Sequence, residues 1–259
     1  MTRTVLHAMD ISTARRHAPR EVDVAAPNAD RDPSVAALRN WRRRVVHAAD
    51  VLAMQYGSPR LGNVKEPTTE LFYILLSNRS DPRRCAEAFT QLKARFRPWS
   101  RLLGACVDDV QALLQPLGMD RVRAERMLAI AVRLQSDFGA VSLRPLRTWP
   151  VPQALRYLTA LPGVGEKSAR CVLMYSLGHD VSPVDAHQLR VMTRLGLLPE
   201  GTTVDTAHRL LDRWMPDGYA RRLHVNVVAH GRAVCTARSP RCVECRLLSR
   251  CPTGRRLVH

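Results

Sequence analysis

A single lysine stands in a glycine-rich segment of a chain that otherwise uses arginine for its positive charge. The segment reads LPGVGEKSA, residues 161–169, and its lysine is Lys167. Lysine and arginine together number 40, yet only Lys65, Lys93 and Lys167 are lysines. Both residue types hold phosphate, but only a deprotonated primary amine attacks an aldehyde-like carbon to form a Schiff base. Lys167 is therefore a candidate nucleophile, with an ordinary surface lysine at a helix start as the alternative.

The residues before this lysine predict a tight turn between two helices. The turn comprises Leu161, Pro162, Gly163, Val164 and Gly165. Glycine takes backbone angles closed to other residues, so both glycines are expected to use that freedom. Outward-facing N–H groups at the start of the next helix suit a phosphate, although a turn without a ligand fits the same pattern. A place in the first helical turn and partial burial both favour the uncharged amine.

A carboxylate follows eighteen residues later, in SPVDAHQLR, residues 182–190. Asp185 comes after Pro183 and opens an expected helix, where it is a typical N-cap, with Gln188 completing a capping-box pattern. A carboxylate fixed in this way can also take a proton from Lys167 or stabilise positive charge developing on a sugar. The two roles are compatible because both require a rigid side chain.

Four cysteines near the C-terminus have the spacing C-x6-C-x2-C-x5-C: Cys235, Cys242, Cys245 and Cys251. Four thiolates within so short a segment can surround one centre, and both zinc and a [4Fe–4S] cluster accept four such ligands. The spacing alone leaves both open. The total of seven cysteines is odd, which argues against a secreted disulfide framework and favours a reducing compartment. The other three, Cys85, Cys106 and Cys171, are expected to be buried.

The net charge of +17 indicates a polyanionic partner, and nucleic acid is the usual one. A biased composition would explain arginine in place of lysine but not so large a surplus. No apolar run is long enough for a membrane span. The arginines near the N-terminus make a transit peptide conceivable, but Asp10, Glu21 and Asp23 argue against it. We therefore expect a cytoplasmic, nucleoid-associated protein.

The remaining pattern predicts an all-α protein. Residues 1–33 lack periodicity and are expected to form a flexible N-terminal tail. Apolar residues recur at helical spacing after Ser34. A buried helix follows Pro67 with Thr68 or Thr69 as its cap, and another has Ser80 or Asp81 at its cap. Further helices are expected over about 107–115, 120–137, 152–160, 167–177, 186–195, 203–213 and 218–232.

LPGVGEKSA, VDAHQLRV and the four cysteines together resemble the endonuclease III branch of the helix-hairpin-helix DNA glycosylases, over residues 35–252. The resemblance implies that Lys167 is the nucleophile and Asp185 the essential carboxylate, and that His187 and Arg190 support the site or contact DNA. It implies a [4Fe–4S] cluster on the four cysteines. It also implies a two-domain fold with the active site in the cleft between the domains. One domain, 64–182, carries the hairpin; the other combines 34–63 with 183–259 and contains a cluster loop, 235–251.

Two positions depart from the family pattern. Arg79, in LLSNRSD, stands where endonuclease III has a glutamine in LLSxQ, and Met119, in PLGMDRVRA, stands where leucine is usual. Flexible, apolar Met119 can serve as a wedge in the DNA stack. Arg79 can bond an orphaned base, favouring guanine, or hold a phosphate. The chain is poor in aromatics, and no stacking residue marks a base pocket.

The resemblance implies a monomeric, bifunctional DNA glycosylase and abasic-site lyase. It would excise damaged bases, with oxidised pyrimidines as the first expectation, from double-stranded DNA containing damaged bases or abasic sites. One alternative is a family member with altered lesion specificity or abasic-site lyase activity alone. Another is a non-catalytic DNA-binding helix-hairpin-helix protein, and a third is a zinc-bound regulatory DNA-binding protein.

Overall fold

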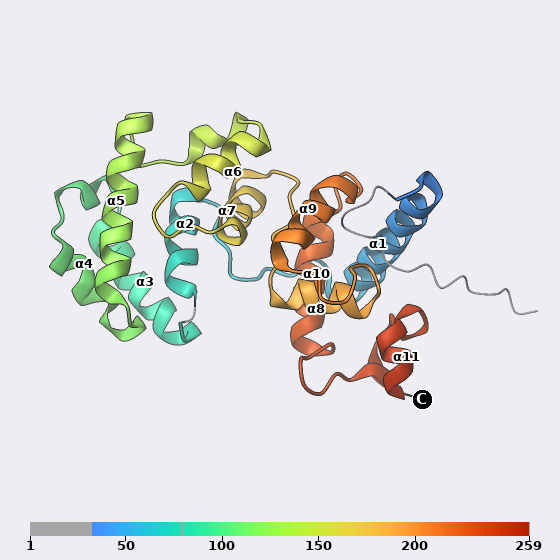
Figure 1. Ribbon diagram of the computed structural model, residues 1–259. Helices are drawn as coiled ribbons and strands as arrows, with labels where there is room; N and C mark the ends of the chain where they lie inside the picture. The colour runs from blue at the N-terminus through green and yellow to red at the C-terminus, as the bar shows by residue number, and fades with distance from the viewer. Residues whose placement is uncertain (1–32, 79, 259) are drawn as a thin grey trace, which may run out of the picture.

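The structure is a computed structural model that describes residues 33–78 and 80–258. The described residues form helices and turns without any strand, which confirms the all-α fold class. The expected flexible tail lies outside the described residues except for Pro33. None of the helices in the described ranges is both long and apolar enough to cross a membrane. The ribbon divides into two lobes (Figure 1).

The first lobe lies at the left of Figure 1 and carries the predicted hairpin. Its buried side chains, which include Phe72, Leu92, Leu114 and Met127, form one core drawn entirely from residues 71–181. Its last helix continues directly into a π-helical turn, Leu173–Leu177. The helices of this lobe are α2 Pro67–Ser77, α3 Pro82–Phe96, α4 Val107–Leu114, α5 Asp120–Phe138, α6 Val151–Thr159 and α7 Glu166–Val172.

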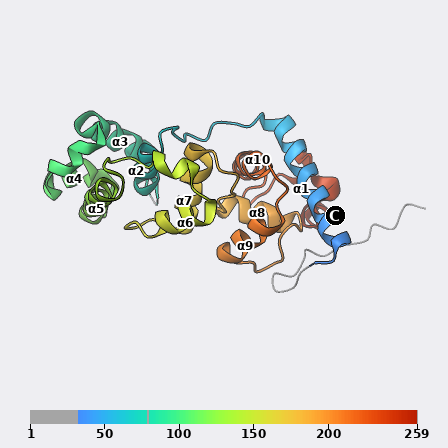
Figure 2. The same cartoon turned by 90° about the horizontal axis from the view of Figure 1, so that it is seen from above.

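The second lobe joins the first described helix to the C-terminal half of the chain, as both ribbon views show (Figures 1 and 2). Its core draws on residues 41–52 and 184–251, so the predicted domain boundary at 182/183 runs between the two cores. Trp41 and Trp214 pack edge to face at 5.9 Å within it. Its helices are α1 Val35–Tyr56, α8 Ala186–Arg194, α9 Val204–Trp214, α10 Ala220–Ala233 and α11 Pro252–Val258.

The caps of the helices follow the expectations in part. Ser34 accepts a hydrogen bond from Ala37 N–H at the start of α1, and Asp81 caps α3. The cap of α2 was wrongly predicted: Glu66 accepts from the N–H groups of both threonines, Thr68 and Thr69. The threonines lie inside the first turn because their hydroxyls are used in the core, where Thr69 Oγ1 accepts from the indole N–H of Trp99. The short α11 was not predicted.

Candidate active site

The turn that precedes the candidate nucleophile joins α6 to α7. Leu161 and Val164 point into the core of the first lobe, whereas Pro162 and Gly163 are exposed. Gly163 has φ +76°, and a Cβ added there would lie 2.6 Å from Cδ of Arg126 on α5. The backbone conformation therefore favours glycine at this position, and a larger residue would also have to displace the flexible side chain of Arg126.

Gly165 does not match the expectation for it. Its φ is −84° and a Cβ would meet open space, so neither conformation nor packing requires glycine here. It is the N-cap of α7, where its carbonyl accepts from Ala169 N–H at 3.0 Å and no side chain caps the helix. The first N–H groups of α7 are thus left without a side-chain acceptor.

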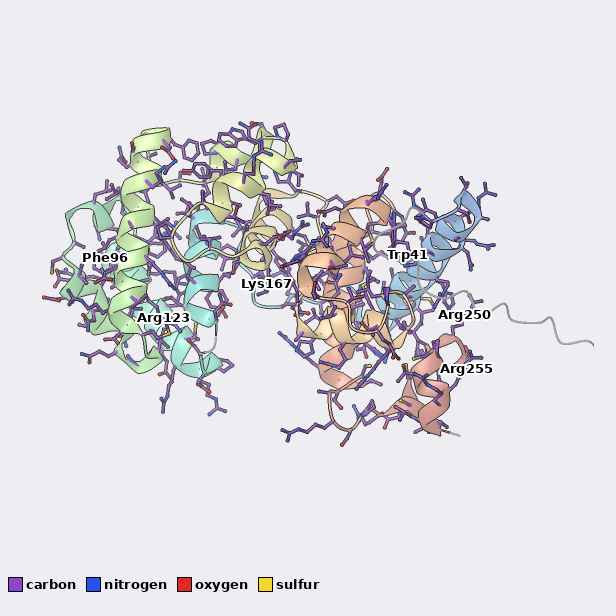
Figure 3. The ribbon with its side chains drawn as sticks, in the orientation of Figure 1. Trp41, Phe96, Arg123, Lys167, Arg250 and Arg255 are labelled. Atoms are coloured by element: carbon purple, nitrogen blue, oxygen red, sulfur yellow. The ribbon has the colours of Figure 1, made fainter. Side chains whose placement is uncertain are left out.

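Lys167 lies in the first turn of α7, half-buried, at the junction of the two lobes (Figure 3). One helical turn later, the thiol of Cys171 forms a hydrogen bond with its side chain. Burial raises the pKa of Cys171 to about 12, although the nearby lysine opposes this shift. Cys171 therefore remains a neutral thiol at ordinary pH and adds no negative charge beside the amine.

Asp185 caps α8 from the second lobe by accepting from Gln188 N–H at 2.8 Å. The reciprocal capping box is not formed. The amide of Gln188 instead donates to Ser182 Oγ at 2.6 Å, and its oxygen lies 2.5 Å from Nδ1 of His224. Since Gln188 is completely buried, this network fixes the backbone on both sides of Asp185.

A cleft of about 530 Å³ separates the lobes and brings Lys167 and Asp185 to one cavity. Two aromatic side chains, Tyr73 and Tyr175, also line it, contrary to the expectation that no stacking residue marks a pocket. In the sequence, each of these tyrosines stands in an apolar stretch and therefore resembles a residue of the hydrophobic core. The other lining residues are Leu61, Asn63, Ile74, Ser77, Ser80, Pro82, Cys85, Cys171, His224, Val228 and Arg232.

Two buried ionisable groups lie beside Lys167. Burial is the largest cause that lowers the pKa of His224 to about 4, with Asp185 opposing the shift and Lys167 adding to it. Glu70 is completely buried, and burial raises the pKa of its carboxyl despite bonds from Asn63 and the N–H of Val64. Lys167 favours the charged form of Glu70. Because its pKa is lowered to about 4, His224 is neutral at ordinary pH and adds no positive charge to the cleft.

Of the two positions that depart from the family pattern, only Met119 is among the described residues, and it lies in a loop of the first lobe. Met119 is 62% exposed and has φ +49° directly after Gly118, an uncommon conformation for a side chain of its size. The turn thus holds an apolar side chain out toward solvent. Arg79 lies outside the described residues. Among the described residues that precede it in sequence, Leu76 and Asn78 accept hydrogen bonds through their carbonyls from the guanidinium of Arg123.

His187 and Arg190 belong to a brace inside the second lobe. Arg190 donates to the carbonyl of Cys235 at 3.0 Å and to that of Gly231 at 2.9 Å, and it lies 3.1 Å from Nδ1 of His187. A Cβ at Gly231 would lie 3.0 Å from His187, so α8 and α10 approach closely here. The structure therefore uses Arg190 to tie the cysteine loop to α8, and its contact with DNA stays a prediction.

The four C-terminal cysteines line a single, mostly apolar pocket between α8, α10 and α11. Nη1 of Arg194 lies 3.3 Å from Sγ of Cys235, and Nε2 of His230 lies 3.5 Å from Sγ of Cys245. N–H groups near sulfur are typical of thiolate ligands. Among the other cysteines, Cys85 and Cys171 are buried, but Cys106 is exposed, contrary to expectation.

Comparison with known proteins agrees with these observations. The HhH-GPD superfamily of base excision DNA repair proteins matches residues 73–217. Endonuclease III of Thermotoga maritima is 30% identical over 198 residues, 76% of this chain and 88% of that protein. Endonuclease III of Bacillus subtilis is 29% identical over 178 residues, 67% and 77% of the two chains.

Among solved structures, a trapped covalent endonuclease III–DNA intermediate superposes with a TM-score of 0.72 at 22% identity. The superposition covers 84% of this chain and 99% of the endonuclease III chain, and it supports the all-α fold described above. The chain thus belongs to the HhH-GPD superfamily of base excision DNA repair proteins and is an endonuclease III-like enzyme of the DNA glycosylase and lyase class.

Proposed function

We propose that this enzyme is a bifunctional DNA glycosylase and abasic-site lyase in which Lys167 is the nucleophile and Asp185 the essential carboxylate. The observation that carries the proposal is that the two side chains come from different lobes and line the same cleft. A cleft of about 530 Å³ lies within the range that accommodates one extruded nucleotide.

The reaction begins when the uncharged Nζ of Lys167 attacks C1′ of the extruded nucleotide. The N–C1′ bond to Lys167 forms as the bond to the base breaks, and the base leaves with the proton that Asp185 takes from the amine and passes on. Asp185 stabilises the positive charge on the sugar and accepts the proton released by the amine. The sugar ring opens to an imine, loss of a C2′ proton expels the 3′ phosphate, and water then releases Lys167.

The cleft supports a planar, polar lesion as the substrate. Tyr73 and Tyr175 offer aromatic faces, while Asn63, Ser77 and Arg232 offer hydrogen-bonding groups. Extruded bases are read by stacking and by bonds to their edges. Oxidised pyrimidines have both a planar amide edge and a small volume, so they are the substrates we propose.

The partner is double-stranded DNA, bound by a monomer. Support comes from the net charge of +17, the exposed tip of the hairpin and the exposed side chain of Met119. Two of the similar solved structures are endonuclease III–DNA complexes. We propose a cytoplasmic, nucleoid-associated location, where reducing conditions preserve the free thiols.

For the four cysteines we propose a [4Fe–4S] cluster. A zinc ion with Zn–S bonds of about 2.3 Å holds its four sulfurs about 3.8 Å apart. All four cysteines are described, and no three of their sulfurs lie within 4.8 Å of one another, although all line one pocket. This wider spacing suits a cluster better than one ion. When bound, the [4Fe–4S] cluster would supply four iron–thiolate bonds that join the loop to α10 and α11.

The test is borohydride trapping on duplexes that contain an abasic site or an oxidised pyrimidine. We expect a covalent adduct with the wild-type enzyme on both, and none with Lys167→Gln, which should still bind the abasic duplex. Trapping on the abasic duplex alone would favour the lyase-only alternative. Binding without any adduct would favour a non-catalytic DNA-binding protein and contradict the proposal.

A further inference from the structure

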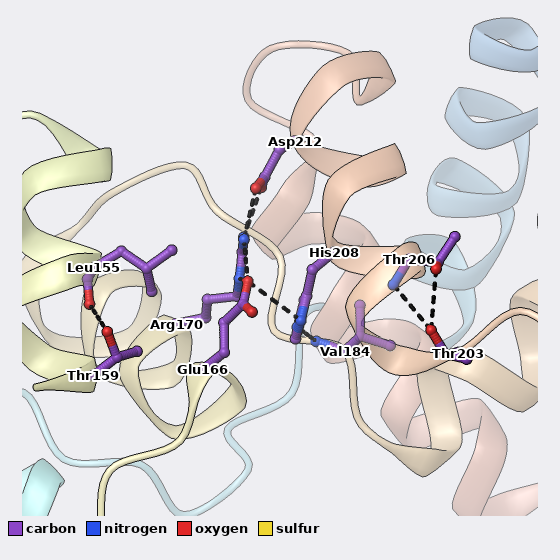
Figure 4. Close-up of polar contacts among 9 residues, drawn as sticks. All are labelled: Leu155, Thr159, Glu166, Arg170, Val184, Thr203, Thr206, His208 and Asp212. Atoms are coloured by element: carbon purple, nitrogen blue, oxygen red, sulfur yellow. Dashed lines mark hydrogen bonds and ion pairs between the residues drawn. The ribbon is translucent and has the colours of Figure 1, made fainter. Parts of the chain in front are cut away.

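Four side chains from α7 and α9 join the two lobes next to the cleft residues in sequence. They come in pairs one helical turn apart, Glu166 and Arg170 on α7 and His208 and Asp212 on α9, and we refer to them as the interlobe clasp (Figure 4). Arg170 donates to both carboxylate oxygens of Asp212 at 2.6 Å and to Glu166 at 2.7 and 3.0 Å. Its side chain is only 2% exposed, whereas those of Glu166 and Asp212 are 37% and 46% exposed, so the contact is shielded from solvent on the arginine side alone.

His208 connects the clasp to both candidate catalytic residues. Its Nε2 accepts the N–H of Val184 at 2.9 Å, and Val184 directly precedes Asp185. Its Nδ1 lies 3.6 Å from Oε1 of Glu166, which directly precedes Lys167 (Figure 4). One imidazole ring therefore contacts the neighbours in sequence of both residues.

The hydrogen bonds determine which nitrogen carries the proton. Because Nε2 of His208 accepts from a backbone N–H, the proton of the neutral ring is on Nδ1 and points toward Glu166. Nδ1 is buried and has no partner within normal hydrogen-bonding distance, which leaves Glu166 as the acceptor that a small movement would engage. The ring is completely buried, so water does not compete for it.

A metal ion is the alternative occupant of this place. Donor atoms of Glu166, Asp205 and His208 all lie within 4.8 Å of one another. An ion on Nδ1 would require removal of its proton while Nε2 still accepts from Val184, which would make the ring an imidazolate. The guanidinium of Arg170 also contacts the same oxygen of Glu166, and its charge repels a cation. The geometry therefore favours a proton on Nδ1.

Burial, more than the charges around the ring, keeps His208 neutral. Burial lowers the pKa of His208 to about 4, and Arg170 adds to this effect. The carboxylates of Glu166, Asp212 and Asp205 oppose it. A protonated ring would have donors on both nitrogens and would lose the bond from Val184.

We propose that His208 is a positioning residue that sets Lys167 against Asp185: its ring bonds the N–H of Val184 in the second lobe and places Nδ1 3.6 Å from Glu166 of the first. The proposal rests on the proposed function, since that function assigns the roles of Lys167 and Asp185. The position of His208 between Val184 and Glu166 does not depend on that function, because it follows from the observed contacts. A displacement of about 1 Å between reacting groups can cost about a hundredfold in rate.

Two variants separate positioning from filling of space. In His208→Gln, the amide oxygen can accept from Val184 and the amide N–H can donate to Glu166, whereas His208→Leu fills the space but bonds to neither. In single-turnover trapping we expect His208→Leu to react about 10- to 100-fold more slowly and His208→Gln to remain within about threefold of wild type. The Kd for duplex DNA should stay within about twofold in both. The control is His47→Leu, which makes the same histidine-to-leucine substitution on α1, outside the interlobe clasp.

A second readout does not depend on turnover. Because the chain has three lysines, protein labelled with 13C at lysine Cε gives three resolvable NMR signals, and Lys167→Gln assigns one of them. In His208→Leu the Lys167 signal should shift while those of Lys65 and Lys93 stay, and His208→Gln should restore it. An unmoved Lys167 signal with normal trapping would overturn the proposal. A shifted signal in an enzyme that never traps would overturn the proposed function instead and leave the positioning intact.

Discussion

The cleft and the cysteine loop are both built for chemistry, but they are held in different ways. In the cleft, Lys167 and Asp185 stand at the starts of helices whose buried faces belong to two apolar cores. In the loop 235–251, only two short 3₁₀ turns are formed, and side chains such as Arg190 and Arg194 hold the backbone through its carbonyls. The cleft thus combines packing of two apolar cores with a few buried hydrogen bonds, whereas the loop depends mainly on polar contacts and, in our proposal, on its ligand.

The thiols of the loop show what that dependence involves. Burial raises the pKa of Cys245 to about 11 and also raises that of Cys251, and repulsion from neighbouring thiolates adds to both shifts. Thiolates in this pocket are therefore unfavourable without a compensating positive charge. In the proposed cluster, iron would supply that charge, so cluster binding and folding of the loop would be coupled, while the cleft needs no such partner.

Substitution of Asp185, the proposed catalytic carboxylate, should separate chemistry from folding in the cleft. Asn can still accept the N–H of Gln188, so Asp185→Asn keeps the cap but loses the charge and the proton acceptor. We expect the single-turnover trapping rate to fall by about 10²- to 10⁴-fold, with Tm within about 3 °C of wild type. A large loss of Tm would show that Asp185 is needed for folding as well as for chemistry, as we expect for the cysteines of the loop.

Substitution of a cluster ligand should affect folding and function together. In Cys245→Ser, one iron–thiolate bond is lost, and we expect loss of the visible absorption and a fall in Tm of roughly 10 °C or more. Cys106→Ser is the matched control because Cys106 is exposed and outside the loop. Retention of colour and Tm in Cys245→Ser would mean that the four thiols do not share one centre.

Loss of the brace should lower stability by a smaller amount. Arg190→Leu removes donors from the carbonyls of Cys235 and Gly231, which should cost about 2–3 kcal/mol in the free energy of unfolding. Arg238→Leu changes an exposed arginine of the same loop and should instead reduce the salt dependence of DNA binding by about one unit of slope. Urea unfolding and salt titrations measure the two effects. If Arg190→Leu changed only the salt slope, Arg190 would be a DNA contact as the family resemblance predicts.

The sequence was most informative where a local pattern determines the structure. The turn before Lys167, the cap at Asp185 and the spacing of the cysteines each depend on neighbours within a few residues. The family, the fold class and the class of enzyme followed from these motifs together and are confirmed. Most helices also begin and end near their expected bounds, because caps and apolar periodicity are local signals.

The missed features depend on residues far apart in the chain. Tyr73 and Tyr175 look like core residues until the two lobes are placed around a cleft. Arg170 and Asp212 are 42 residues apart, and no spacing rule connects them. At Glu66, the threonines that looked like caps were taken by tertiary bonds to Trp99 and Leu143, so the preceding carboxylate caps α2 instead.

A further expected effect is a pH dependence of stability to which His208 and His224 contribute, as does His230 in the cysteine pocket, whose pKa burial also lowers to about 4. Both His208 and His224 are buried with pKa values lowered to about 4, against about 6.5 in the unfolded chain. Between these values the unfolded chain binds more protons, so stability falls as pH decreases from about 6.5 to 4, by up to roughly 1 kcal/mol per pH unit for each ring. Urea unfolding across this range should show a shallower slope for His208→Gln and for His224→Gln than for wild type. Equal slopes in all three proteins would mean that the loss of stability at low pH comes from groups other than His208 and His224.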